Sequence, residues 1–493
     1  MSLISVNNLT FAYEGSYDTI FADISFQIDT DWKLGFTGRN GRGKTTFLRL
    51  LCGAYEYSGT ISSSVDFEYF PYEVPHPEAP TIDVIDSVCP KYEQWELSRE
   101  LSLLEVDEDI LYRPFETLSN GERTKILLSA LFLKENSFLL IDEPTNHLDM
   151  HGRALVSRYL NAKSGFILVS HDRTFLDGCI DHILSINKAN IEIQRGNFSS
   201  WLANKERQDN FELAENEKLQ KEISHLSAAA KRTSNWSDKV EKTKFATKNS
   251  GIKPDRGYVG HKAAKMMKRS KVMETRRQSA IEEKSKLLQN IESADDLKVI
   301  GLQYHTRRLI ALDHVSIRYD EKTVCQDVSF TIEQGDRIAL YGKNGSGKSS
   351  IVKLICGEVP VFTGDFHRGT NLRISYVPQD TSFLAGDLSD FAAQHGIDES
   401  IFKAMLRKLD FSRLQFEKDM KDFSGGQKKK VLIAKSLSEN AHLLVWDEPL
   451  NFIDVISRLQ IEDLLLADKP TILFVEHDAA FCQRIATKTY ALA

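Results

Sequence analysis

The middle of the chain, residues 199–300, carries a sparse but regular pattern of apolar positions on a polar background. Two sets of four positions at 4-3-4 spacing follow each other there: Leu219, Ile223, Leu226 and Ala230, then Ile281, Lys284, Leu288 and Ile291. Such spacing gives a helix one narrow apolar stripe, which suits packing against a single partner helix. The pattern therefore predicts two long helices packed antiparallel.

The helix-breaking residues of this stretch are confined to one short segment. Between Gly196 and Gly301 the chain has one proline, Pro254, and three glycines, all within residues 249–260. Glycine and proline interrupt helices, so this arrangement is typical of helix–turn–helix. A first arm from Ser199 to about Val240 would be on the order of 60 Å long at 1.5 Å per residue.

The two flanking parts of the chain show a different pattern, in which short strands alternate with helices. Each flank opens with alternating strands, such as Ile24 to Ile28 and Val328 to Ile332. Each then runs from an apolar strand through a glycine-rich loop into a helix. This order favours an α/β domain with a largely parallel sheet.

The flanks are two copies of one unit. Four motifs recur in the same order at offsets of 304 to 306 residues: Lys44 and Lys348, Ser119 and Ser424, Asp142-Glu143-Pro144 and Asp447-Glu448-Pro449, Ser170-His171-Asp172 and Glu476-His477-Asp478. A register kept over so many residues indicates an internal duplication. The predicted division is a domain at 1–198, a helical hairpin at 199–304 and a second domain at 305–493.

Charge distinguishes the hairpin from the domains. The 493-residue chain has a net charge of −7, but residues 231–277 contain 15 Lys and Arg against 4 Asp and Glu. A basic projection between acidic domains indicates a polyanionic partner.

Membrane insertion and metal–thiolate chemistry are not expected. The apolar runs are far shorter than the ~20 residues that a membrane-spanning helix needs, and Met1 to Val6 does not resemble a signal peptide. The six cysteines are scattered without paired spacing, which is typical of free thiols in a reducing cytosol.

Both copies carry the pattern G-x-x-x-x-G-K-[ST] between an apolar strand and a helix, at 38–45 and 342–349. Its glycines let backbone N–H groups converge on phosphate oxygens, the lysine meets the β- and γ-phosphates, and the hydroxyl binds Mg²⁺. The residues expected at the nucleotide are Gly38, Asn40, Gly41, Gly43, Lys44, Thr45 and Thr46, and Gly342, Asn344, Gly345, Gly347, Lys348, Ser349 and Ser350. Thr45 and Ser349 are the metal ligands among them.

An Asp-Glu pair ends an apolar strand in each copy, after Phe138 to Ile141 and after Leu443 to Trp446. The aspartates, Asp142 and Asp447, are expected to hold magnesium. The glutamates, Glu143 and Glu448, are expected to polarise the attacking water.

With a Ser-x-Gly-Glu/Gln helix start added, these motifs resemble the nucleotide-binding domains of the ATP-binding cassette (ABC) superfamily. The resemblance covers both copies, here called the first cassette (1–198) and the second cassette (305–493). It implies that two ATP molecules lie head to tail between the cassettes of one monomer. Lys44 would then share a nucleotide with Ser424 and Gly426, and Lys348 with Ser119 and Gly121.

The same resemblance assigns the remaining nucleotide contacts. His171 and His477 would be the switch histidines, Tyr13 and Tyr319 would stack on adenine, and Gln379 would sense magnesium. Asp149 and Asp454 would belong to the D-loops.

Some positions depart from the superfamily pattern. Tyr72 stands where Gln379 stands in the second cassette. The helix starts Ser119-Asn120-Gly121-Glu122 and Ser424-Gly425-Gly426-Gln427 resemble the superfamily's signature motif, and the first has Asn120 for glycine and Glu122 for glutamine. Asparagine tolerates left-handed backbone, so Asn120 need not disable that motif. We expect two unequal ATP sites.

Two fused cassettes with a long charged linker resemble the ABC-F family of translation-associated ATPases. That resemblance implies a cytoplasmic protein on the bacterial ribosome, whose hairpin enters by the tRNA exit site and reaches large-subunit rRNA and P-site tRNA. Cations and aromatics near the turn, about 241–262, suit RNA contact. The expected contact residues are Lys244, Phe245, Lys248, Lys253, Arg256, Tyr258 and Lys262.

Within that family the chain is similar to the antibiotic-resistance branch, and to its Lsa-type proteins. The resemblance implies protection of the ribosome from lincosamides, streptogramin A and pleuromutilins. Two other classes stay open, a housekeeping translation factor of the same architecture and the ATPase subunit of a transporter. A DNA-repair cassette fits less well, because its coiled coil would interrupt one cassette instead of joining two.

Overall fold

The computed structural model describes residues 2–14, 19–146, 148–186, 191–243, 256–287, 301–319, 322–343, 345–358 and 361–492. Its internal contacts divide the chain into two compact units. The larger comprises Met1–Ile186, Asn190–Ser199 and Ala294–Ala493, and the smaller comprises Asn187–Ala189 and Ser200–Ser293.

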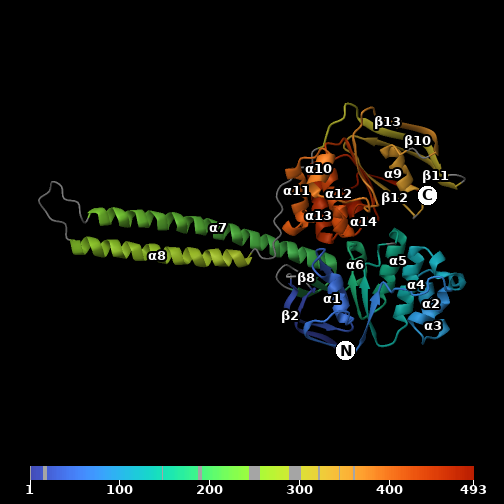
Figure 1. Ribbon diagram of the computed structural model, residues 1–493, viewed down its shortest axis with the longest axis horizontal. Coiled ribbons are helices and arrows are strands. Elements are labelled where there is room, and N and C mark those ends of the chain that lie inside the picture. The colour runs from blue at the N-terminus through green and yellow to red at the C-terminus, as the bar shows by residue number, and fades with distance from the viewer. Residues whose placement is uncertain are drawn as a thin grey trace. The chain divides into compact units, whose positions relative to one another are not determined.

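In the first cassette an antiparallel sheet of order β2-β1-β4 accompanies a six-stranded sheet of order β5-β6-β7-β3-β8-β9 (Figure 1). The large sheet is parallel except for the β8–β9 pair. The strands of the first cassette are β1 (Leu3–Ala12), β2 (Thr19–Asp29), β3 (Lys33–Gly38), β4 (Ser58–Ser62), β5 (Asp66–Phe70), β6 (Ser137–Asp142), β7 (Phe166–Val169), β8 (His182–Ile186) and β9 (Ile191–Arg195). Its helices are α1 (Lys44–Leu51), α2 (Thr81–Val88), α3 (Gln94–Leu103), α4 (Asn120–Phe132), α5 (Met150–Asn161) and α6 (Arg173–Cys179).

The second cassette repeats this plan, with an antiparallel sheet β11-β10-β13 and a parallel sheet β14-β15-β16-β12-β17. Its strands are β10 (Arg308–Tyr319), β11 (Lys322–Glu333), β12 (Arg337–Gly342), β13 (Val361–Arg368), β14 (Ile374–Val377), β15 (Leu443–Asp447), β16 (Ile472–Val475) and β17 (Lys488–Leu492). Its helices are α9 (Lys348–Cys356), α10 (Leu388–Gln394), α11 (Glu399–Lys408), α12 (Gly425–Ser438), α13 (Val455–Asp468) and α14 (Ala479–Ile485). The α/β prediction with a largely parallel sheet is confirmed for both copies.

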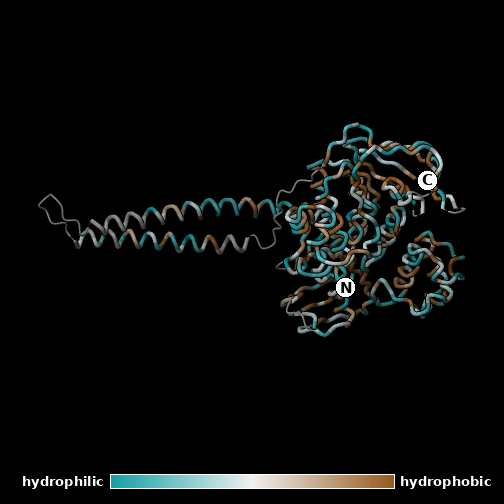
Figure 2. Tube along the Cα trace, turned by 45° about the horizontal axis from the view of Figure 1, so that its top comes forward, coloured by the Kyte–Doolittle hydropathy of each residue, from teal (hydrophilic) through white to brown (hydrophobic). Residues whose placement is uncertain are grey.

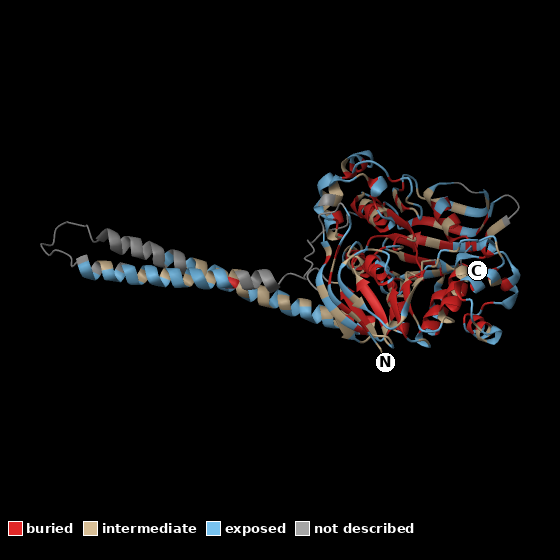
Figure 3. Cartoon of the chain, turned by 60° about the horizontal axis from the view of Figure 1, so that its bottom comes forward, coloured by how far each residue is buried: buried red, intermediate tan, exposed pale blue. Residues whose placement is uncertain are grey.

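The central strands are buried on both faces, as parallel strands covered by helices must be. In β15 every residue is buried, and in β7 and β16 likewise. The buried residues, red in Figure 3, fill both cassettes. In each cassette the parallel strands end at the same edge of their sheet. The residues that follow β3 and β6 therefore lie close together in the first cassette, and those that follow β12 and β15 in the second. This brings each glycine loop beside an Asp-Glu pair.

A buried ion pair joins the cassettes within the larger unit. The guanidinium of Arg173, at the start of α6, donates to both carboxylate oxygens of Glu462 on α13. Arg484 also donates to Glu462, at 2.7 Å, and the Glu462 side chain is fully buried. One carboxylate shared by two guanidinium groups is well compensated for its burial.

The smaller unit is built on two long helices, α7 (Phe198–Thr243) and α8 (Arg256–Leu287), which run side by side in Figures 1 and 3. The 46 residues of α7 make it about 69 Å long at 1.5 Å per residue. The predicted helical hairpin is therefore present, and its first arm is slightly longer than expected.

The predicted stripe on α7 is confirmed where the structure describes it. Leu219, Ile223 and Leu226 are half-buried. The 4-3 spacing of half-buried positions continues toward the start of α7 through polar residues: Lys205, Asp209, Glu212 and Asn216. In Figure 2, hydrophilic and hydrophobic residues accordingly alternate along the arm.

On α8 the stripe begins earlier than the sequence pattern indicated. Met266, Ser270, Met273 and Arg277 are half-buried, and Ala280 is buried. Of the predicted set, Ile281 is half-buried, the side chain of Lys284 lies outside the described part, and so do Leu288 and Ile291. The polar members at 270 and 277 concealed the spacing.

The predicted turn at 249–260 was partly wrong. Helix α8 begins at Arg256, so Gly257 and Gly260 lie in its first turns. Glycine costs about 1 kcal/mol relative to alanine inside a helix, and the lysines, alanine and methionines that follow can sustain the helix against that cost. Four expected RNA contacts, Lys244, Phe245, Lys248 and Lys253, lie outside the described residues.

In the part of the chain that the structure describes, no helix combines the length and the apolar character needed to cross a bilayer.

Candidate functional site

A cavity of about 460 Å³ brings the glycine loop of the first cassette to the start of helix α12 in the second. Its lining includes twelve of the predicted residues: Tyr13, Asn40, Gly41, Gly43, Lys44, Thr45, Thr46, Asp142, Glu143, His171, Ser424 and Gly426. Ile20, Val169, Gly425 and Phe452 complete it. This cavity is called the first site.

Left-handed backbone shapes the glycine loop before α1. Gly43 has φ 88°, and a Cβ atom there would lie 2.5 Å from Ile20 Cγ2. Only glycine fits this conformation and this space. The loop therefore turns sharply and starts helix α1 at Lys44, with the free N–H groups of the helix N-terminus at the cavity.

The lysine of the glycine-rich loop folds back over its own loop in both cassettes. Lys44 Nζ donates to Gly38 O at 2.7 Å, and Lys348 Nζ donates to Gly342 O at 2.8 Å. Burial lowers the pKa of both amines, most strongly by desolvation, and nearby carboxylates oppose that effect. Each ammonium is thus placed where phosphates would lie over the loop.

Three elements of the two cassettes meet at the first site. Asn40 Nδ2 donates to Phe452 O at 2.6 Å, across the cassette boundary. A Cβ atom at Gly426 would lie 2.4 Å from the same carbonyl, so the signature glycine permits this close approach. The sequence motifs indicated Asn40 and Gly426 for this site, and Phe452 contributes its backbone carbonyl.

The oxygen groups at the phosphate end suit a hard cation. Thr45 Oγ1 donates to Asp142 Oδ2 at 2.7 Å, and the Tyr69 hydroxyl donates to the same oxygen at 3.0 Å. In the second cassette Asp447 Oδ1 is buried without a hydrogen-bond partner among the described residues. Mg²⁺ prefers carboxylate and hydroxyl oxygens, with phosphates and water completing its shell. These residues therefore fit Mg²⁺.

Tyr69 was missed by the sequence reasoning, which compared Tyr72 with Gln379. It occupies the end of β5, in register with Tyr376 on β14. Burial and the Asp142 carboxylate raise the pKa of Tyr69 well above its usual value, so it is a hydrogen-bond donor there. The duplication register could have indicated it, because a tyrosine recurs two residues before each proline.

The glutamate and histidine of the first site lie together. His171 Nε2 is 3.3 Å from Glu143 Oε1, and both side chains are largely buried. Burial, and then the charge of Asp142, raise the pKa of Glu143 to about 8, while burial holds the pKa of His171 well below its usual value.

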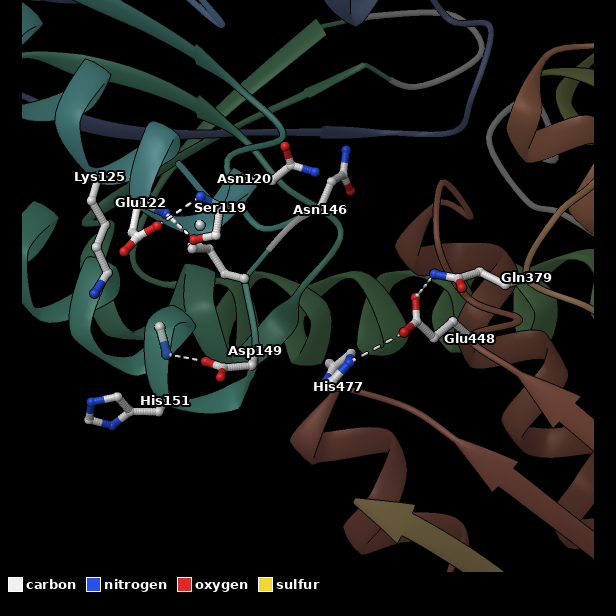
Figure 4. Close-up of a pocket in the computed structure, with 13 residues that line it drawn as sticks. Ser119, Asn120, Glu122, Lys125, Asn146, Asp149, His151, Gln379, Glu448 and His477 are labelled. Carbon is white, nitrogen blue, oxygen red and sulfur yellow. Dashed lines mark hydrogen bonds and ion pairs between the residues drawn. The ribbon is translucent and has the colours of Figure 1, made fainter. Parts of the chain in front are cut away.

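A second cavity, of about 530 Å³, brings the start of helix α4 in the first cassette close to Glu448 and His477 of the second (Figure 4). Of the predicted residues, Ser119, Gly121, Asp149, Gln379, Glu448 and His477 line it. Asn120, Glu122, Lys125, Asn146, Leu148, His151 and Gly152 complete the lining. This cavity is called the second site.

Glu448 is held by three neighbours at the second site. Its Oε2 accepts hydrogen bonds from Gln379 Nε2 and Asn451 Nδ2, each at 2.8 Å, and its Oε1 lies 3.5 Å from His477 Nε2. Burial alone would raise the pKa of Glu448, but the contacts with His477 and Asn451 keep it below its usual value. The pKa values of the two glutamates are thus shifted in opposite directions, that of Glu143 upward and that of Glu448 downward.

Some predicted residues of the second site lie outside the lining of its cavity. They are Gly342, Gly345, Gly347, Lys348, Ser349, Ser350, Asp447 and Tyr319. Asn344 lies outside the described residues. Gly38 is also absent from the lining of the first site, where it serves as the acceptor for Lys44.

Both signature serines cap their helices, as predicted. Ser119 and Ser424 accept from the backbone N–H three residues on, while the side-chain oxygens of Glu122 and Gln427 accept from the backbone N–H of the serine. These capping boxes leave the helix N-termini facing the cavities. Asn120 sits in helix α4 without a positive φ, so the argument about left-handed backbone is not needed.

Comparisons with known proteins agree with this geometry. The family model described as "ABC transporter" matches residues 21–146 and 325–451, half of the chain. ATP-binding protein Uup of Buchnera aphidicola subsp. Schizaphis graminum is 25% identical over 512 residues, covering 99% of this chain and 80% of its own. Ribosome protection protein VmlR of Bacillus subtilis is 26% identical over 489 residues, covering 98% and 85%.

Solved structures share the fold. RNase-L Inhibitor superposes with a TM-score of 0.61 at 18% identity, covering 93% of this chain and 82% of that one. The archaeal ribosome recycling factor aABCE1, in complex with stalk protein aP1, gives 0.60 at 18% identity, covering 93% and 82%.

The match of the family model to both copies, each with its glycine loop and Asp-Glu pair, shows what the duplicated domains are. The chain belongs to the ABC transporter family and carries two ABC ATPase domains, which bind and hydrolyse ATP.

Proposed function

We propose that this protein binds the bacterial ribosome and protects it from antibiotics of the peptidyl-transferase centre: lincosamides, streptogramin A and pleuromutilins. The hairpin of α7 and α8 inserts by the tRNA exit site and reaches large-subunit rRNA and P-site tRNA. ATP hydrolysis drives release. The protein acts as a monomer in the cytoplasm, with both ATP sites formed within one chain.

The observation that carries this proposal is the row of cations on α8. Six basic side chains there are exposed: Lys262, Lys265, Lys268, Arg269, Lys271 and Arg276. Tyr258 near the start of the helix is 66% exposed. Exposed cations beside an exposed aromatic side chain are what single-stranded and folded RNA binds. Arg256, Tyr258 and Lys262 remain proposed contacts.

The relatives favour a ribosomal partner. VmlR bears the name of a ribosome protection protein and aligns along nearly the whole of this chain. Its resemblance supports carrying ribosome protection to this chain as a proposal, and the Lsa-type drug range is a finer part of the same proposal.

We propose that each ATP site combines residues from both cassettes. Lys44 with Ser424 and Gly426 would hold one nucleotide, and Lys348 with Ser119 and Gly121 the other. Glu143 and Glu448 would each orient an attacking water, with His171 and His477 against the γ-phosphate. Mg²⁺, held by Thr45 and Asp142 or by Ser349, Gln379 and Asp447, would neutralise developing phosphate charge. Tyr13 and Tyr319 would stack on adenine.

Two other functions compete. A housekeeping translation factor would share the ATP sites and the ribosome but would not change drug sensitivity. A transporter subunit would need a membrane partner and would leave the cations of α8 without a ligand.

Binding to ribosomes separates these classes. The Glu143→Gln/Glu448→Gln double variant should co-sediment with bacterial ribosomes when ATP is present and not when ADP replaces it, because ATP would hold the cassettes closed. The assay is pelleting through a sucrose cushion at two salt concentrations, since cation–phosphate contacts weaken with salt. A protein that stays in the supernatant with ATP would rule out both translation functions.

A further inference from the structure

Three positions near the ATP sites differ between the cassettes in a coordinated way. In the register of the duplication, Thr124, Thr145 and Ser170 of the first cassette correspond to Lys429, Leu450 and Glu476 of the second. Three hydroxyl side chains are thus replaced by a cation, an apolar residue and an anion. All three positions of the second cassette are buried.

In the first cassette the three hydroxyls form neutral local hydrogen bonds. Thr145 Oγ1 and Ser170 Oγ are 3.2 Å apart, and Ser170 Oγ accepts from Asp172 N at 3.2 Å. Thr124 Oγ1 donates to Asn120 O, within its own helix. Ser170, the residue before His171, is thus linked to Thr145 in the loop after β6 through the two side-chain hydroxyls.

In the second cassette the Glu476 carboxylate stands in the position of the Ser170 hydroxyl and accepts hydrogen bonds from two backbone N–H groups. Glu476 Oε1 accepts from Leu450 N at 2.7 Å, and Oε2 accepts from His477 N at 3.1 Å. Leu450 lies two residues after Glu448. One buried carboxylate, only 3% exposed, thus joins the loop after the catalytic glutamate to the backbone of the switch histidine.

Lys429 supplies a buried positive charge in the same region. The side chain is 2% exposed, and its Nζ donates to Pro378 O at 2.9 Å. Burial lowers the pKa of Lys429 to about 8. Among the carboxylates whose charges oppose this lowering, Glu476 has the largest effect. Pro378 precedes Gln379, whose amide donates to Glu448. Lys429 thus connects helix α12 to the loop that holds Glu448.

We propose that Glu476 is a positioning residue of the second site, which holds His477 and the loop after Glu448 in one geometry. The first cassette has hydroxyl residues, Thr124 and Ser170, where the second has Lys429 and Glu476. Because α12 also presents Ser424 and Gly426 to the first site, Lys429 lies on the element that the two sites share. The inference rests on the proposed roles of Glu448 and His477.

The physical reason for this positioning role is that the Glu476 carboxylate links two loops. His477 Nε2 lies 3.5 Å from Glu448 Oε1. The two residues are on separate loops, His477 after β16 and Glu448 after β15. Glu476 accepts from both loops at once, so their separation cannot change without breaking one of two charge-assisted hydrogen bonds. Small displacements of groups around a reacting phosphate cost large factors in rate.

The test measures each site separately. In a Glu143→Gln background, turnover comes from the second site, and Glu476→Gln should lower its kcat about 10-fold or more while the KM for ATP changes by less than about 2-fold. In a Glu448→Gln background, turnover comes from the first site, and the same substitution should have a much smaller effect. The matched variant Ser170→Ala should show the opposite preference.

A second variant guards against simple misfolding. Glu476→Gln removes the carboxylate whose charge most opposes the lowering of the pKa of Lys429, whereas Glu476→Gln/Lys429→Met removes both buried charges. The double variant should regain thermal stability but keep the low kcat of the second site, because an amide cannot accept from Leu450 N and His477 N as the carboxylate does. Recovery of kcat together with stability would overturn the proposal, as would an equal loss in both backgrounds.

The site assignment has its own readout. The Glu143→Gln/Glu448→Gln protein should have almost no turnover. Substantial turnover there would overturn the roles of the two glutamates, and the inference about Glu476 with them. Loss of turnover there, with an unchanged kcat for Glu476→Gln in the Glu143→Gln background, would overturn the inference alone.

Discussion

Replacing both Glu143 and Glu448 by glutamine should lower steady-state ATP turnover by roughly 10²–10³-fold, because glutamine cannot accept a proton from the attacking water. Each glutamate lies beside a histidine, Glu143 with His171 and Glu448 with His477. Glutamine keeps the size of the side chain, so the cavities and the ATP affinity should persist.

Turnover is measured as phosphate release, and ATP affinity with a fluorescent ATP analogue. Glu399→Gln is the control, since this glutamate is exposed and pairs with Lys403 on α11, outside both sites. Parallel loss of ATP binding and turnover would mean that the glutamates support the fold of the sites and not the chemistry.

Shortening the predicted turn within residues 249–255, before α8 begins, should abolish protection from antibiotics while ATP turnover without ribosomes stays within about 2-fold of the parent protein. The ATP sites belong to the larger unit and the turn to the smaller one, so the change leaves the glycine loops and both Asp-Glu pairs intact. The hairpin would no longer reach the drug-binding region.

The readouts are inhibitory drug concentrations in cells and phosphate release by the purified protein. A Lys218→Ala/Lys221→Ala variant is the matched control, because it removes two exposed cations from α7 without shortening the hairpin. Protection that survives the shortened turn would make the tip a spacer and would place the effective contacts on the arms.

The duplicated ATP sites could be predicted because their determinants are local. The glycine at 43 must adopt φ > 0, the helix must start at Lys44, and Ser119 must cap α4, and each of these follows from a few adjacent residues. The register of the duplication then supplied the pairing of the motifs.

What the sequence concealed depends on contacts between distant segments. Tyr69 reaches Asp142 across 73 positions, and the Phe452 carbonyl meets Asn40 across 412. The ion pair of Arg173 with Glu462 has no local signal, since each is an ordinary helical residue. On α8 the half-buried Ser270 and Arg277 masked a regular stripe that apolar counting could not find.

The measurement that tests the central claim most directly is the inhibitory concentration of a lincosamide, a streptogramin A and a pleuromutilin in a susceptible bacterium that expresses this protein. We expect the wild-type protein to raise it for these drugs. The Glu143→Gln/Glu448→Gln variant and the variant with the shortened turn should not, although both accumulate to the same level. Inhibitory concentrations that match the empty vector for all three drugs would contradict ribosome protection and favour a housekeeping translation factor.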